Sequence, residues 1–572
     1  MILQALNDYY ERMLADPRID VSEFGFGQQG VHFALPLDRN GNLVGRPLDL
    51  RDEKGRARRI EVPGPVGRTV GVASNFAWDN TGYVLGADGK GKPERTADTH
   101  ASFKALAAEV LEGVEDEGAA ALLAFLEGWD PERAPELPDW ETVIDQNIVF
   151  MLDGEPGFLH DRPVFREAWV RHLESSKGGE KGMCLVTGET APIPATHPKI
   201  KGVIGAQTAG ASLVSFNFDA AKSFDKDQNY NAPVSERAAF AYTTALNLLL
   251  APDSHRKLRV GETTVVFWAD APGEAESFYN YAMGGKPAED KDQAERLEGY
   301  LAAVARGKFP EELGDAKTPF YVLGLSPNAA RLSVRFWQVS TVGGMAENLG
   351  NHYRALALQR RFESDPEHPS PWQLLRDLAP QRDSRNLSPL LFGQLVRSVT
   401  QGLPYPQTLL SAAIGRIRAD KEINYLRTAV IKAFLVRNND NEEITMALNK
   451  ENRETGYLLG RLFATLERTQ NTALGNVNAS VRDKYFASAA ATPGLVFPIL
   501  IQNAQHWLSK MSKDKERLAR YYNGIIMEIV GGLDDKQGYP RTLQLGDQGL
   551  FTIGYYQQMQ DFFTKKEKNT ED

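Results

Sequence analysis

The pattern of apolar residues changes at about Asn386, and this change constrains the fold more than any other feature of the sequence. Beyond it, apolar residues recur at i, i+3, i+4 and i+7, the spacing that lines one face of an α-helix. The segments with this spacing are 388–402, 408–420, 423–438, 455–474, 497–532 and 551–565. Gly or polar residues separate them, so we predict an all-α helical bundle over 381–572.

Residues 1–380 have a different texture, which predicts an α+β region with mixed sheets. Short β-rich runs bounded by Gly, Asp or Asn are typical of strands, and they occur at 31–38, 83–88, 202–207, 211–218 and 263–270. Two further runs, 320–326 and 332–340, flank Pro327-Asn328 and predict a long hairpin. A helix is expected after residues 231–236, with Pro233 in its first turn.

Charge is distributed unevenly along the chain, so the net charge of -10 is a poor guide to what the protein binds. Residues 105–148 contain twelve acids and one base, Arg133, a net of -11 that leaves +1 for the rest. Ionic screening limits a field to about 8–10 Å, so an acidic lobe and a basic groove can share one chain. We expect the acidic stretch to be a solvated helical surface or, alternatively, a contact with a basic partner subunit.

A Gly- and Pro-rich segment, 51–68, contains six bases and three acids and reads as a basic loop. Its bases Lys54, Arg56, Arg58 and Arg59 are candidates for binding DNA phosphates, because neutralising a phosphate releases counterions. The alternative is an ordinary solvated loop.

Two segments carry candidate base-reading side chains. In 74–92, Asn75 and Asn80 could offer a donor and an acceptor to a base edge, although such residues also bond their own backbone in turns. In 201–218, glycines allow a close backbone approach. The weaker candidates in that segment are Gln207, Ser212 and Asn217.

The end of the chain is more basic than the rest, since residues 446–572 carry +2 and residues 1–445 carry -12. Bases interleaved with aromatics suit a single strand, which binds by phosphate neutralisation and base stacking. The alternative is that the aromatics are core and the bases helix surface. We select as candidates for binding such a single strand Arg461, Arg468, Arg482, Lys484 and Lys510.

No catalytic constellation is recognisable. The phosphate-cradling, GxSxG and HExxH motifs do not occur, and the nine histidines are scattered. The only cysteine, Cys184, is expected to be a buried structural thiol in a reducing cytoplasm. His160-Asp161 resembles the doublet of HD-type metal nucleases but lacks the further ligands, so we predict no metal and no cofactor. No apolar run reaches the ~18 residues of a membrane span, which predicts a soluble protein.

Several stretches together resemble one family, the large subunit of the type I-C CRISPR surveillance complex, Cascade. They follow the family's order over nearly the whole chain at 78–86, 186–217, 231–250, 457–470, 491–500 and 545–563. One departure is Gln557, where the family commonly has His, and this puts any role of that side chain in doubt.

The resemblance implies a cytoplasmic, non-catalytic subunit that works with a crRNA and other Cascade subunits. Such a subunit lies near the 5′ handle of the guide. It recognises the protospacer-adjacent motif (PAM) on double-stranded DNA, helps to open the duplex and stabilises the displaced strand, after which a helicase–nuclease is recruited. The family also implies that 446–572 is made separately as a small subunit, and Met446 follows the polar break at 437–443. The alternatives are a purely structural scaffold subunit and a nuclease using His160 and Asp161.

Overall fold

The computed structural model describes most of the chain, namely residues 1–17, 19, 21–64, 71–176, 180–285, 290–383, 386, 388–439, 441, 443–475, 479–533 and 538–564. Contacts divide the chain into two units. Unit 1 comprises Met1–Ile200 and Ser212–Leu248, and unit 2 comprises Lys201–Ala211 and Leu249–Asp572. No described helix is both long and apolar enough to cross a membrane.

Unit 1 is built around a mixed sheet of order β3-β2-β6-β5, in which β2 and β6 are parallel and the other pairs antiparallel. A separate ribbon pairs β1 with β4, and a short one pairs β7 with β8. The strands of this unit are β1 Phe26–Val31, β2 Phe33–Leu37, β3 Leu48–Asp49, β4 Arg58–Pro63, β5 Trp78–Asn80, β6 Asn147–Leu152, β7 Lys181–Met183 and β8 Thr190–Pro192.

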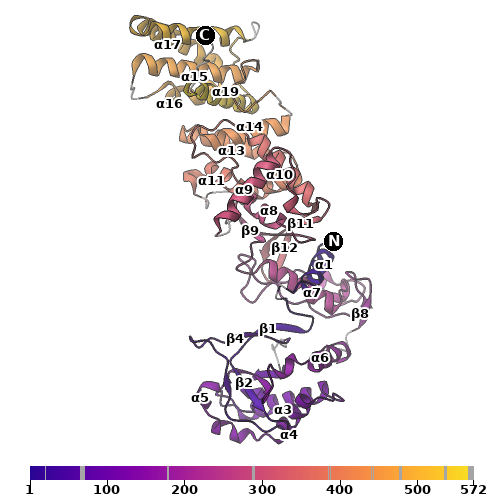
Figure 1. The fold of residues 1–572 in the computed structure, drawn as a ribbon. Coiled ribbons are helices and arrows are strands. Elements are labelled where there is room, and N and C mark those ends of the chain that lie inside the picture. The colour runs from indigo at the N-terminus through magenta and orange to yellow at the C-terminus, as the bar shows by residue number, and fades with distance from the viewer. Residues whose placement is uncertain are drawn as a thin grey trace. The chain divides into compact units, whose positions relative to one another are not determined.

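Both faces of this sheet are buried. Successive side chains of a strand point to opposite faces, so Phe33 and Leu35 of β2 join the main core while Ala34 joins a smaller cluster with Val62 of β4. Figure 1 shows α3 and α4 beside the sheet, and they fill the main core. The helices of unit 1 are α1 Ile2–Leu14, α2 Thr81–Val84, α3 Pro93–Val110, α4 Glu117–Gly128, α5 Trp140–Val143, α6 Pro163–Ser176 and α7 Glu236–Leu249, with 3-10 turns η1 Pro131–Glu136, η2 Leu159–Asp161, η3 Asp219–Ala221 and η4 Gln228–Asn231.

Unit 2 begins with an antiparallel sheet of order β12-β11-β10-β9. The predicted hairpin is confirmed, because β11 and β12 pair up to a turn beside Pro327-Asn328. The predicted strand at 263–270 is confirmed as β10. The strands are β9 Lys257–Val260, β10 Thr263–Ala269, β11 Pro319–Asn328 and β12 Arg331–Thr341.

Helices make up the rest of unit 2, so the predicted fold class, an α+β region with mixed sheets followed by helices, is confirmed. One hydrophobic core runs from Val260 to Tyr556, joining the β9–β12 sheet to the last helices. The division into units therefore does not coincide with the boundary predicted at 380/381. The helices are α8 Ala275–Met283, α9 Lys291–Ala305, α10 Val342–Leu356, α11 Pro371–Leu378, α12 Pro389–Gln401, α13 Gln407–Asp420, α14 Tyr425–Asn439, α15 Thr455–Leu474, α16 Val481–Ala491, α17 Pro493–Asp514, α18 Glu516–Gly531 and α19 Leu545–Phe563, with 3-10 turns η5 Glu311–Leu313 and η6 Pro380–Arg382.

Three predicted strands are wrong. Residues 83–88 fall in α2 and the turn after it, because the Asn80 side chain accepts the Gly82 N–H and starts a helical turn. Residues 202–207 form turns, since Gly202 and Gly205 have φ of +85° and +79°, outside the extended region. Residues 211–218 likewise form no named strand.

The helix expected after residue 231 exists, but Pro233 precedes it rather than occupying its first turn. Helix α7 begins at Glu236, and the Ser235 hydroxyl accepts the N–H of Ala238, 3.3 Å away. Ser235 therefore acts as the N-terminal cap.

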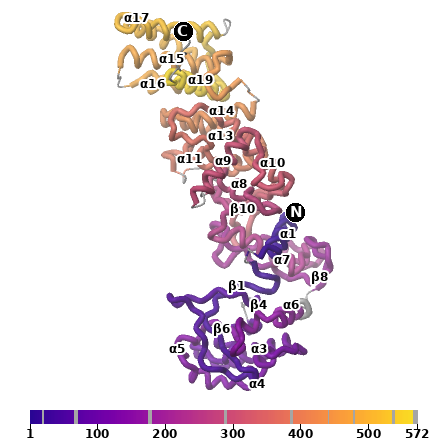
Figure 2. Tube along the Cα trace, viewed as in Figure 1, coloured from indigo at the N-terminus to yellow at the C-terminus, as the bar shows by residue number. Residues whose placement is uncertain are grey.

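Helices α15 and α19 approach each other unusually closely, and glycines make this possible. Figure 2 traces the two helices side by side near the C-terminus. A methyl group on Gly460 would overlap the backbone carbonyl of Phe551, and one on Gly554 would overlap that of Tyr457. The contact is therefore backbone against backbone, and neither glycine can be enlarged without moving a helix.

We predict that Gly460→Ala destabilises unit 2 by more than about 2 kcal/mol, because overpacking against a backbone forces the helices apart. The control is Gly415→Ala on α13, where a methyl group would meet nothing within 4 Å. Alanine is the better helix former by about 1 kcal/mol, so the control should be neutral or stabilising. Thermal and urea unfolding measure both, and equal stability of the two variants would contradict the prediction.

Candidate nucleic-acid interface

Asn80 lies at the end of β5, where it caps α2. Its Oδ1 accepts the N–H of Gly82 at 3.0 Å, and the residue is half-buried. Asn75 is buried, with 4% of its surface exposed, and its backbone N–H donates to Asp79 Oδ2 at 3.0 Å. Of the two residues predicted to read a base, only Asn80 is therefore accessible at the surface in this structure.

A cavity of about 420 Å³ opens beside Asn80. Its lining includes three exposed bases, Lys90 and Lys92 in the loop before α3 and Arg95 in the first turn of α3. It also includes one acid, Asp88, whose carboxylate accepts the Lys90 N–H and the Thr96 hydroxyl. Sequence reasoning selected the segment 74–92 but did not select these cations. The signal that could have found them is the presence of three bases among residues 90–95, around the start of a helix that begins at Pro93.

The predicted basic loop is partly a strand, since Arg58 and Arg59 lie at the start of β4. All four candidate bases of this segment, Lys54, Arg56, Arg58 and Arg59, are exposed. Arg56 pairs with Asp52 at 2.7 Å, and the same carboxylate accepts the backbone N–H of Lys54. Among the described residues, Lys54, Arg58 and Arg59 form no ion pair, which leaves three cations for phosphates.

The Gly-rich segment is shared between the two units. Gln207 is exposed and belongs to unit 2, whereas Ser212 and Asn217 belong to unit 1. Ser212 is buried, and its hydroxyl accepts a hydrogen bond from Lys199 Nζ at 2.7 Å. Asn217 is exposed.

Arg461 does not lie on the surface as predicted. It is 1% exposed, its Nε donates to Gln558 at 3.1 Å and its guanidinium pairs with Glu528 at 2.9 Å. These bonds join α15 to α18 and α19. Burial keeps the guanidinium from a bound strand in this structure, so its role here is to hold the helices together.

The other C-terminal candidates differ in exposure. Lys484 on α16 and Lys510 on α17 are exposed, while Arg468 is half-buried with its guanidinium 4.7 Å from the centre of the Phe563 ring. Arg482 is half-buried, 4.0 Å from the buried carboxylate of Glu467. Burial lowers the pKa of Arg482, but Tyr555 and Glu467 outweigh it and raise that pKa above its ordinary value. Arg482 therefore stays charged at the edge of the bundle.

Cys184 is buried and free, in agreement with its prediction. Burial raises the pKa of its thiol, but hydrogen bonds involving Ser235 and Thr187 outweigh this and lower the pKa to about 7.

His160 is buried against the carbonyl of Glu61, 3.0 Å from its Nε2, and burial lowers its pKa. No group of three metal-binding side chains occurs in the part of the chain that the structure describes. The polar break at 437–443 contains residues 440 and 442, which lie outside the described residues, and Met446 is exposed.

The acidic stretch 105–148 covers the end of α3, all of α4 and α5, and the turns between them. Eleven of its twelve acids are exposed, and the twelfth, Asp116, is half-buried and pairs with Arg162 at 2.7 Å. This agrees with the predicted solvated helical surface. The same exposure also leaves the surface open to a basic partner.

We predict that Arg461→Ala lowers the free energy of unfolding by about 2–3 kcal/mol, because it leaves the buried Gln558 side chain without its donor. Lys484→Ala, at an exposed position, should change stability by less than about 0.5 kcal/mol. Urea denaturation compares the two variants. Unchanged stability of the Arg461 variant, combined with weaker binding of single-stranded DNA, would restore the surface assignment.

A family described as CRISPR-associated protein (Cas_Csd1) matches residues 6–563, nearly the whole chain. No curated protein matches the chain.

Proposed function

Because the chain belongs to the Cas_Csd1 family of CRISPR-associated proteins, we propose that it is the non-catalytic large subunit of a type I-C Cascade complex. In this role it binds the PAM duplex, helps to open it and stabilises the displaced strand while the crRNA pairs with the target strand. A separate helicase–nuclease is recruited after the strands have separated. The partners are the crRNA, the other Cascade subunits and the target DNA.

The observation that carries the proposal is the basic lining of the cavity beside Asn80. A protein that reads a short motif needs a side chain with a donor and an acceptor for a base edge, and cations that fix the duplex in register. Asn80 supplies the first, and Lys90, Lys92 and Arg95 supply the second. The exposed bases of β4 and its preceding turn belong to the same unit and offer further cations for phosphates.

The exchange of a DNA duplex for an RNA–DNA hybrid is nearly balanced in free energy, so modest contacts with the protein can decide it. Contacts with the displaced strand would come from the exposed and half-buried bases of the last helices, Arg468, Arg482, Lys484 and Lys510. These residues need no reactive group for this role, which fits a subunit that binds DNA and leaves cleavage to another protein.

A scaffold role is the second candidate, and the exposed acidic surface of 105–148 favours it. Under this alternative the subunit holds basic partner subunits and does not read DNA. Gel-shift binding of a PAM duplex to the complex with and without this subunit separates the two, since equal binding would favour the scaffold.

We predict that Asn80→Asp reduces the preference of the assembled complex for PAM over non-PAM duplexes about tenfold. Aspartate keeps the cap of α2 but removes the amide donor that a base edge needs, and one good base contact is worth about 1–3 kcal/mol. Gel-shift titration with the two duplexes measures the preference. Asn40→Asp, at an exposed turn of the same unit, adds the same charge and should leave the preference unchanged.

If the Asn80→Asp complex keeps its full preference, the base-reading role of Asn80 is wrong even though the family stands. Asn75→Ala is the parallel test for the buried neighbour. A loss of preference without a loss of stability would show that Asn75 becomes exposed to the duplex on binding.

We predict that replacing Lys54, Arg58 and Arg59 together by Gln lowers the slope of log affinity against log salt by about 2–3, since each phosphate contact contributes about 0.9. PAM preference should not change, because phosphate contacts carry no sequence information. Arg56→Gln is the matched control: its guanidinium already pairs with Asp52, so the slope should change little. An unaltered slope in the triple variant would remove this surface from the DNA interface.

A further inference from the structure

A tight turn in the loop between α10 and α11 presents an aromatic ring to solvent. The Asp365 carboxylate accepts the backbone N–H groups of Arg361 and Phe362, at 3.0 and 2.9 Å. The Asp365 N–H in turn donates to the Phe362 carbonyl. The turn is thus closed on itself, and the Phe362 side chain, 59% exposed, is not drawn into the core.

A cavity of about 330 Å³ lies against this ring. Three cations line it, Arg361, Lys421 and Arg482, and they come from three separate parts of the chain. The Arg361 guanidinium lies 5.1 Å from the centre of the Phe362 ring. Among the described residues, Arg361 and Lys421 form no ion pair, so their charges face the cavity and the solvent.

The two acids that line the cavity are already engaged. Asp365 holds the turn around Phe362, and Glu422 binds the Arg382 guanidinium through both oxygens at 2.7 and 2.8 Å. The cavity therefore offers an anion two cations without ion-pair partners among the described residues, beside an aromatic ring that is 59% exposed.

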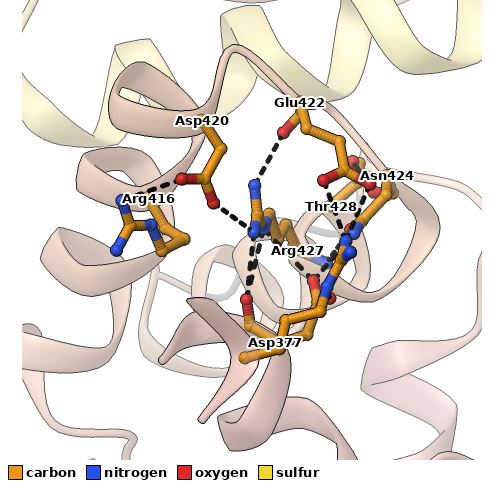
Figure 3. Close-up of polar contacts among 8 residues, drawn as sticks. Asp377, Arg416, Asp420, Glu422, Asn424, Arg427 and Thr428 are labelled. Atoms are coloured by element: carbon orange, nitrogen blue, oxygen red, sulfur yellow. Dashed lines mark hydrogen bonds and ion pairs between the residues drawn. The ribbon is translucent and has the colours of Figure 1, made fainter. Parts of the chain in front are cut away.

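A buried ion-pair network fixes the turn that carries Lys421 (Figure 3). Arg427, 1% exposed, binds Asp377 at 3.1 Å and Asp420 at 2.7 Å, and it also donates to the carbonyl of Glu422. Lys421 sits between these anchored residues in the left-handed conformation, with φ of 56°. Its backbone is therefore held in place before any ligand arrives.

We propose that this cavity binds an unpaired nucleotide of single-stranded DNA, with the base stacked on Phe362 and the flanking phosphates beside Arg361 and Lys421. Proteins bind single strands by this combination, because every base has a π face and every nucleotide carries one charge. The inference rests on the proposed function, since strand displacement supplies the unpaired DNA. Arg482 was already predicted to bind the displaced strand. The inference adds two segments distant in sequence, those of Phe362 and Lys421, which were not predicted from the sequence.

The test measures the affinity of the full-length protein for a fluorescein-labelled single-stranded DNA and for the same sequence as a duplex. Phe362→Ala is expected to weaken single-strand binding about tenfold and to change duplex binding little. Phe362→Trp, which keeps a stacking surface, should restore it. Phe224→Ala is the control, because Phe224 is 93% exposed but does not line this cavity, and it should bind as the unchanged protein does.

Charge is tested separately through Lys421→Gln, which should lower the salt slope for the single strand by about 0.7, the value for one phosphate contact. Phe362→Ala binding at full affinity would overturn the proposal. A loss of affinity that Phe362→Trp does not restore would also overturn it. So would a poly-glutamate competitor that displaces the DNA equally well from the unchanged protein and from Phe362→Ala, because this result would indicate an acidic protein segment as the occupant.

The failure of this inference and that of the proposed function give different results. PAM preference of the assembled complex depends on unit 1, so Phe362→Ala should leave it unchanged. The complex could show no PAM preference while the isolated subunit still needs Phe362 to bind single-stranded DNA. This result would overturn the proposed function but support the single-strand site.

Discussion

The buried guanidinium of Arg427 is the interaction on which the middle of unit 2 depends. It binds the Asp377 carboxylate at the end of α11 and the Asp420 carboxylate at the end of α13, and it belongs to α14. Removing one partner of such a pair leaves an uncompensated buried charge, which costs about 3–5 kcal/mol. Three helix ends are therefore fixed by one side chain. The turn at Lys421 follows from this, because Asp420 and Glu422 on either side of it are both bonded to Arg427, while the exposed Lys421 side chain forms no ion pair among the described residues.

Burial of a cation against a distant acid also explains why the DNA-binding cations were hard to predict from the sequence. Arg461, Arg427 and Lys484 all occur on helices, and nothing in their spacing separates a base that faces solvent from one that is buried with an acid. In the structure Arg461 and Arg427 are each 1% exposed, while Lys484 is exposed. The partners that bury them, Glu528 and Asp377, lie 67 and 50 residues away. A pairing over such a distance is a property of the tertiary fold and leaves no local signal.

The parts of the fold that were predicted correctly are those that a local pattern determines. Apolar residues at helical spacing predicted α12 to α15 and α19, and two β-rich runs flanking Pro327-Asn328 predicted the β11–β12 hairpin. Predictions failed where one residue overrides the pattern. The Asn80 cap turns an apolar run into a helical turn, and Gly202 and Gly205 adopt positive φ within residues that otherwise favour strands. The candidate site was predicted only in part: the segment around Asn80 was selected from the sequence, but the cations that border its cavity, Lys90, Lys92 and Arg95, were not.

The three candidate DNA-contacting surfaces are presented by turns in which an Asn or Asp side chain accepts a backbone N–H group. These side chains are Asn80 at the start of α2, Asp52 before β4 and Asp365 at the turn of Phe362. Such a turn satisfies its own backbone polar groups, so neighbouring side chains need not fold inward to do so. This explains how Lys54 and Phe362 stay exposed on ordered backbone. A preordered turn loses little conformational entropy when it binds. The proposed strand exchange is nearly balanced in free energy, so a few contacts from fixed turns are enough to favour it. Longer flexible loops would have to be ordered on binding, and the entropy cost would offset part of the free energy of their contacts.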